Sequence, residues 1–408
     1  MNFRQEKLAN GLTIVAEINP DAASMGMGFF VRTGSRDEDA SVAGVSHFLE
    51  HMVFKGTDTR GPLDINRELD NLGATYNAST SEENTFYYAT VLPENQDRIV
   101  DLLCDILRPA LRAEDFNMEK NVILDEIARY EDLPHFKTFE KTMATYFRDH
   151  PLGNSVLGTN ESIGALTLEQ MRGYFNRRYS PGNMVLAGAG NMDFDGFIEQ
   201  VTEKCGSWQR FDVGRELSAA PGRTDTVVVT DTNTARQHIG AMSPAPSRQD
   251  EERYVAHIAA TIIGGSTNSR LFYALVDPAI ADMASMTFDG LDGTGAFLTY
   301  LSCDAERAGE VVDIFRRELK KFMDEGPTDN ELVAAQNQQA ASATLRSEMP
   351  MGRLMRIGFD WTYVGKYIPV DEHVEKLLSV TKEQVLALVR RYDLLAMSMY
   401  ALGPIEKL

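Results

Sequence analysis

The residues best suited to chemistry lie in one short stretch, SHFLEHMVFKGT, at residues 46–57. His47 and His51 are four residues apart, so on a helix their imidazoles project from one face, one turn apart. Glu50 lies between them, near enough to that face to reach a water held by the same metal. The order H-x-x-E-H inverts the commoner H-E-x-x-H zinc motif. It predicts two neutral nitrogen ligands and one carboxylate free for proton transfer.

A third ligand is needed, because catalytic zinc sites normally have three protein ligands and a water. A second helix, expected at residues 113–129, carries carboxylates that could serve. Its Glu119 and Glu126 are seven residues apart and therefore share a face, two turns from each other. Exposed glutamates are common on helices. The spacing alone leaves two interpretations open: solvated surface carboxylates, or groups that face the metal.

The elements around these residues are expected to be strands and helices in alternation. Residues 25–33 predict a buried strand, after which Ser41 is a plausible N-cap for the motif helix and Gly56 ends it. Residues 74–93 predict a hairpin rich in β-branched and aromatic side chains, and residues 3–17 predict another.

The second half of the chain repeats the order of the first. With an offset of 210 residues, AHIAATIIGGST aligns with SHFLEHMVFKGT, and His257 falls at the position of His47. In this copy Ala260 and Thr261 replace the glutamate and the second histidine. His257 is therefore expected to be a packed or surface histidine and not a ligand. The repeat predicts two domains of similar fold.

Length and composition agree with two ordinary globular domains. At 408 residues the chain is long for a single core, and 43% hydrophobic with 25% charged residues is typical of soluble protein. The net charge of −20 argues against nucleic acid or an anionic membrane as a partner. The three cysteines are widely spaced, and neither a signal peptide nor a membrane-spanning run is evident. A cytoplasmic location is expected.

Taken together, the motifs resemble those of the M16 metallopeptidases, an inverzincin family that includes mitochondrial processing peptidase, insulin-degrading enzyme and small bacterial zinc proteases. The resemblance rests on HFLEHMVFKGT, on RYSPGNMVLAGAGNMD, and on VILDEI, whose glutamate follows the H-x-x-E-H motif by about 75 residues. It implies that His47, His51 and Glu126 bind one Zn²⁺ per chain. Glu50 would then be the general base, and Glu119 would orient a ligand from close by.

The same resemblance implies an α+β architecture. It consists of two homologous α/β domains of the M16 type, the LuxS/MPP-like metallohydrolase fold, each a mixed sheet of about six strands with helices packed on it. We expect a zinc-bearing domain at residues 1–212, a linker at 213–224, and a second domain without the metal motif at 225–408. In this family, chains of this length form half a clamshell, and two of them close around a peptide chamber.

A substrate site also follows from the resemblance. In the family, the substrate backbone adds as an extra β-strand to an edge strand beside the zinc. The matching residues here are Asn77, Ala78, Ser79 and Thr80. Backbone pairing ignores side chains, so the expected substrates are peptides or unfolded segments of varied sequence.

The resemblance further implies a partner chain. Active members supply an arginine and, seven residues later, a tyrosine from the second domain of the facing half, and these bind substrate and stabilise the oxyanion. Aligned on SRLF, these positions are Val276 and Met283, and neither can donate as required; Arg270 is the nearby candidate to replace them. We therefore expect a zinc metalloendopeptidase that is the zinc-bearing member of a heterodimer with an M16-like chain, or a slow homodimer. The alternative is a non-catalytic M16-like scaffold or a peptide-binding subunit.

Overall fold

The structure is a computed structural model that describes every residue except Glu216 and Ala219. The chain forms two compact units, each of which includes a segment from the other half of the sequence. The first unit comprises Met1–Ala128, Asn154–Glu216 and Leu345–Ile368, and the second comprises Arg129–Gly153, Leu217–Thr344 and Pro369–Leu408. The predicted linker at 213–224 includes both residues that lie outside the described part of the chain.

The first unit is built on a six-stranded sheet with the order β1-β2-β6-β3-β5-β4. Its strands are β1 (Asn2–Lys7), β2 (Thr13–Ile18), β3 (Met25–Val31), β4 (Thr75–Thr80), β5 (Thr85–Val91) and β6 (Met184–Gly190). Strands β2 and β6 are parallel and the other neighbours are antiparallel, so the sheet is mixed. The central β3 and β6 are buried along their whole length, while β4 forms an edge.

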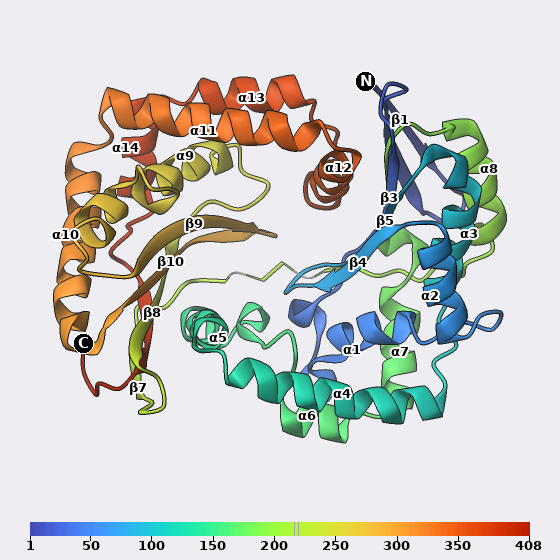
Figure 1. Cartoon of the computed structure of the whole chain (residues 1–408), viewed down its shortest axis with the longest axis horizontal. Helices are drawn as coiled ribbons and strands as arrows, with labels where there is room; N and C mark the ends of the chain where they lie inside the picture. The colour runs from blue at the N-terminus through green and yellow to red at the C-terminus, as the bar shows by residue number, and fades with distance from the viewer. Residues whose placement is uncertain (216, 219) are drawn as a thin grey trace. The chain divides into compact units, whose positions relative to one another are not determined.

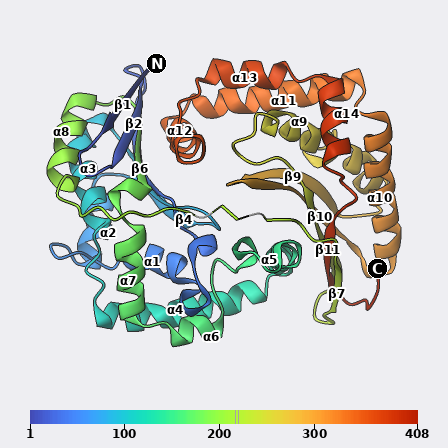
Figure 2. The ribbon, with the colours of Figure 1, turned by 180° about the vertical axis from the view of Figure 1, so that it is seen from behind.

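Helices cover both faces of this sheet, as Figures 1 and 2 show. The helices of this unit are α1 (Val45–Val53), α2 (Pro62–Asn71), α3 (Gln96–Ile106), α4 (Ala113–Glu131), α6 (Asn160–Ala165), α7 (Leu168–Arg178), α8 (Phe194–Cys205) and α12 (Pro350–Val364). Successive side chains on a strand point to opposite faces. Phe30 of β3 therefore packs with Leu354 and Ile357 of α12, whereas Phe29 lies near Trp208 on the face covered by α3 and α8.

The metal-motif helix α1 begins at Val45, so the predicted cap at Ser41 is wrong. Gly44 precedes the helix with φ = 89°, and a Cβ added there would lie 2.7 Å from neighbouring atoms. The helix N-terminus is instead closed by the buried carboxylate of Glu38, which accepts hydrogen bonds from the N–H groups of Gly44 (2.6 Å) and Ser46 (2.7 Å). Sequence spacing gives no sign of this cap, because its acceptor lies six residues before Gly44 and outside the helix.

The second unit has a five-stranded mixed sheet with the order β7-β11-β8-β10-β9. Its strands are β7 (Thr226–Thr230), β8 (Arg236–Pro244), β9 (Met283–Leu291), β10 (Thr294–Asp304) and β11 (Ser398–Gly403). This order matches the order β2-β6-β3-β5-β4 of the first sheet, strand for strand. The predicted internal repeat is therefore visible in the topology. The outer strand β1 has no counterpart among the described residues.

The helices of the second unit are α5 (Pro134–Phe147), α9 (Arg253–Gly264), α10 (Ala308–Glu325), α11 (Asp329–Ser347), α13 (Val370–Leu378) and α14 (Lys382–Arg391). Helix α5 packs on β8 and β11 through a cluster that includes Met143, Tyr146 and Met242. Helices α9, α10 and α14 pack on the larger core. Together the two units confirm the predicted α+β fold of two similar domains.

Short helical turns complete the chain: 3-10 turns at Ser35–Asp37, Ala40–Val42, Pro93–Asn95, Pro151–Gly153, Pro181–Asn183 and Ala305–Arg307, and a π-helix at Phe272–Val276. Among the helices of the described residues, none is both long enough and apolar enough to cross a bilayer.

Candidate metal centre

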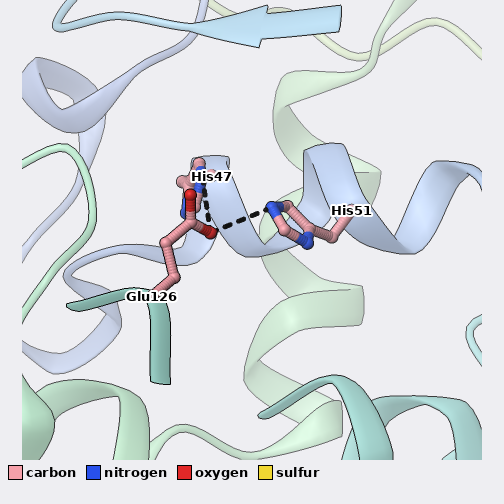
Figure 3. Close-up of side chains that lie close together, drawn as sticks. All are labelled: His47, His51 and Glu126. Atoms are coloured by element: carbon pink, nitrogen blue, oxygen red, sulfur yellow. Dashed lines mark ion pairs between the residues drawn. The ribbon is translucent and has the colours of Figure 1, made fainter. Parts of the chain in front are cut away.

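Three predicted ligands lie together in the first unit. His47 and His51 project from one face of α1 toward α4, and the carboxylate of Glu126 reaches both rings (Figure 3). Glu126 Oε2 lies 3.7 Å from His47 Nε2 and 3.4 Å from His51 Nε2. One ligand atom from each of the three residues lies within 4.8 Å of the others.

These separations suit a shared metal better than direct pairing. A hydrogen bond between nitrogen and oxygen normally measures about 2.7–3.2 Å. Zinc–ligand bonds of about 2.0–2.2 Å in tetrahedral geometry place neighbouring ligand atoms roughly 3.3–3.5 Å apart. Two imidazole nitrogens and one carboxylate oxygen are also a common donor set for catalytic zinc. The residues present therefore fit a zinc ion.

Burial prepares His47 for this role. Burial, with a smaller effect from the nearby His51, lowers the pKa of His47 to about 3, so that its imidazole is neutral at physiological pH. A neutral ring has a nitrogen lone pair to give to a metal. His47 Nδ1 is buried and has no hydrogen-bond partner among the described residues.

His51 is oriented by a carboxylate behind it. Its Nδ1 lies 2.8 Å from Glu119 Oε1, and Glu119 Oε2 lies 2.6 Å from the ammonium of Lys55. Burial alone would lower the pKa of His51, but the hydrogen bond with Glu119 and the charges of Glu126 and Glu50 raise it overall. When Nδ1 donates to Glu119, Nε2 is left as the acceptor that faces Glu126. Sequence spacing indicated Glu119, but not Lys55.

Glu50 points from the same helix and is held at one oxygen. Its Oε2 accepts a hydrogen bond of 2.7 Å from the hydroxyl of Thr80, the last residue of β4. Burial raises the pKa of Glu50, which the Thr80 hydrogen bond partly offsets. A carboxylate of raised pKa is better suited to take up and release a proton near neutral pH. The contact between Thr80 and Glu50 was not predicted, because it joins elements 30 residues apart in the chain.

The other predicted substrate residues lie along the edge strand β4. Asn77 and Ser79 are exposed, and the side chain of Ala78 is buried. Ala78 lies opposite Tyr87 of β5, yet its N–H donates to Asn77 Oδ1 at 2.9 Å. The Ala78 N–H is therefore directed away from β5, toward the open edge of the sheet.

The counterpart of this centre in the second unit is closed by other contacts. His257 of α9 packs edge-on against Phe288, with ring centroids 4.9 Å apart. Thr261, at the position of the second histidine, accepts a hydrogen bond of 2.7 Å from Gln339. The surroundings of His257 thus agree with the expectation that it is packed.

Arg270, the candidate to replace the missing donors, is engaged elsewhere. Arg270 donates to Glu331 at 2.7 Å and to the carbonyl of Gly326 at 2.9 Å, within the second unit. Val276 ends the π-helix, and Met283 starts the edge strand β9 with half of its surface exposed.

Two family models match successive parts of the chain. Residues 13–160 match the model described as insulinase (peptidase family M16), and residues 165–339 match the model described as the peptidase M16 inactive domain. Together they span most of the sequence.

Similar proteins and structures agree with this match. A protein of Mycobacterium tuberculosis (strain ATCC 25618 / H37Rv), named an uncharacterized zinc protease, is 33% identical over 95% of this chain and 90% of its own length. The uncharacterized zinc protease YmxG of Bacillus subtilis is 30% identical over 94% and 93%. The crystal structure of a protease from Helicobacter pylori superposes with a TM-score of 0.92 at 19% identity, covering 99% of both chains, which supports the fold. With this breadth of sequence match, the chain belongs to peptidase family M16.

Proposed function

We propose that this chain is a zinc metalloendopeptidase that cleaves peptides or unfolded segments. The observation that carries the proposal is the convergence of His47, His51 and Glu126 on one point, with a separate half-buried carboxylate, Glu50, on the helix of the two histidines. The relatives named as zinc proteases support zinc as the metal.

Each side chain has a distinct task in this proposal. His47, His51 and Glu126 would hold one zinc ion per chain, and Glu119 would keep His51 in the tautomer that can bind it. The bound ion would polarise the scissile carbonyl and increase the acidity of the attacking water. Glu50 would take a proton from that water and deliver it to the nitrogen of the leaving amine.

The substrate would lie along β4. This strand is at the edge of its sheet, and the Ala78 N–H already points outward, where a peptide backbone could pair with it. Asn77 Oδ1 would have to release that N–H when a peptide binds. Pairing through the backbone favours extended or unfolded substrates of varied sequence, which the family's closed peptide chamber would select by size.

A second chain of the family would supply the missing oxyanion donors. Valine and methionine at positions 276 and 283 cannot stabilise negative charge, and Arg270 is committed to Glu331. We therefore propose a heterodimer with an M16-like partner that bears the arginine and tyrosine, with a slow homodimer as the fallback. Adding such a co-expressed partner should raise cleavage of a quenched peptide at least about tenfold. High turnover by the isolated chain would contradict this proposal.

The catalytic proposal itself is tested by replacing Glu50 with glutamine. The variant should retain zinc, measured by elemental analysis, because no ligand is changed. It should lose cleavage of a denatured protein by several orders of magnitude, because the amide cannot accept the proton. Full activity in a zinc-loaded Glu50→Gln protein would exclude Glu50 as the base. Normal zinc content in a wild-type protein that cleaves nothing would favour a peptide-binding subunit.

A further inference from the structure

The hydroxyl of Thr80 connects the edge strand to the proposed base. Thr80 Oγ1 donates to Glu50 Oε2 at 2.7 Å, and Thr80 is the last residue of β4. Glu50 Oε1 has no partner in the part of the chain that the structure describes. The two oxygens of the Glu50 carboxylate therefore differ: Oε2 accepts a hydrogen bond, and Oε1 does not.

Buried contacts fix the position from which Thr80 donates. The strand turns back at Ser81, whose N–H donates to the carbonyl of Asn84 at 2.8 Å. Within this turn Glu83 is only 1% exposed and accepts hydrogen bonds from Arg36 Nη1 at 2.6 Å and from the Tyr363 hydroxyl at 2.9 Å. A charged side chain so deeply buried and so fully paired allows little movement of the turn.

Tyr363 brings the C-terminal half of the sequence into this support. It lies on α12, which packs on the first sheet, and its hydroxyl also accepts a hydrogen bond of 2.6 Å from Asn84 Nδ2. The end of the β4–β5 hairpin is thus held from outside the hairpin. Thr80 is consequently a fixed donor to Glu50 Oε2.

We propose that Thr80 is a positioning residue that holds Glu50 Oε2 and leaves Oε1 as the oxygen that exchanges the proton. The inference rests on the proposed role of Glu50 as base. It also connects Glu50 to β4. The strand that would pair with a peptide is then the same strand that orients the carboxylate. The proton passes from the attacking water to Oε1 and from Oε1 to the leaving nitrogen, while the Thr80 hydrogen bond to Oε2 is kept throughout.

Kinetics on the zinc-loaded full chain, with its partner where one is required, give the first test. Thr80→Val keeps the shape of the side chain and removes the donor, and we expect kcat to fall roughly ten- to a hundredfold with KM changed less than about twofold. Thr80→Ser restores a hydroxyl and should recover kcat to within about threefold. Thr226→Val makes the same chemical change at the exposed start of β7, outside the proposed site, and should have no effect.

A crystal structure of each metal-free variant gives a test that does not depend on turnover. The Glu50 carboxylate should be rotated or spread over two orientations in Thr80→Val, and it should keep its wild-type orientation in Thr80→Ser and Thr226→Val. An unmoved Glu50 in Thr80→Val would overturn the proposal, as would a loss of activity through KM that serine does not rescue. If the wild-type protein is inactive, the proposed peptidase function fails, and the orientation of Glu50 still decides the role of Thr80.

Discussion

Replacing Glu119 with glutamine should weaken zinc binding although no ligand is removed. Glu119 is 3% exposed, and both of its oxygens have partners, His51 Nδ1 at 2.8 Å and Lys55 Nζ at 2.6 Å. While Oε1 accepts from Nδ1, the lone pair of His51 lies on Nε2, toward Glu126. A glutamine has one amide oxygen and one NH₂ group, so it can accept from only one of these two donors.

The size of the effect follows from that conflict. Loss of such a partner typically weakens metal binding about 10- to 100-fold, or about 1.4 to 2.7 kcal/mol. We expect the upper end of this range, because neither orientation of the amide serves both neighbours. An NH₂ facing His51 favours the tautomer with its proton on Nε2, which cannot bind the metal. An NH₂ facing Lys55 places two hydrogen-bond donors, the amide and the ammonium, next to each other at a buried position without an acceptor between them.

Competition with a chromophoric zinc chelator measures the effect on purified protein. The dissociation constants of wild type, Glu119→Gln and Glu114→Gln should be compared at one pH and salt concentration. Glu114 is exposed on the same helix, so its replacement controls for the loss of one negative charge from α4. A Glu119→Gln dissociation constant within threefold of wild type would refute the argument that this carboxylate sets the tautomer of His51.

Three further predictions concern the support of the site. Burial raises the pKa of Glu38 to about 7, so the folded chain keeps a proton that the unfolded chain has already lost. The free energy of unfolding should therefore fall by up to about 3 kcal/mol as the pH rises from about 5 to 7.5. Thermal melts of Glu38→Gln should show no such decrease over this pH range. Arg353→Met leaves the buried Glu17 without its ion pair and should cost about 3–5 kcal/mol in denaturant unfolding, so an unchanged midpoint would contradict the role of this pair. Gly44→Ala forces a Cβ into a left-handed and crowded position before α1 and should lower both melting temperature and zinc content, whereas Gly73→Ala, at φ = 60° in open space, should leave zinc content unchanged.

The sequence predicts the metal centre because its signals are local. His47 and His51 share one helix turn, whereas Glu126 lies on another helix and was assigned as a ligand by the family resemblance and not by its spacing. The hairpin that contains β4 was also predictable, from its β-branched and aromatic residues and its polar turn. For the two histidines and for the hairpin, the spacing along the chain determines the spacing in the structure.

Contacts between distant elements left no such signal. Nothing in the periodicity of α12 indicates that its apolar face covers the first sheet, since any apolar surface would satisfy the pattern. The ion pair of Arg353 with Glu17 joins residues 336 positions apart, and it becomes visible only once the helix is docked. The same holds for the Glu38 cap on α1, which displaced the predicted start of that helix. The boundaries at 212 and 225 stay a prediction.

Mass spectrometry of a peptide library incubated with the purified chain tests the central claim most directly. The reaction should be run with the chain as prepared, after removal of metal by a chelator, and after zinc is restored, each with and without an M16-like partner chain. Our account predicts internal cuts that disappear with the chelator, return with zinc, and are missing in Glu50→Gln under all conditions. Cuts that persist without metal, or no cuts by a zinc-loaded and partnered chain, would contradict it.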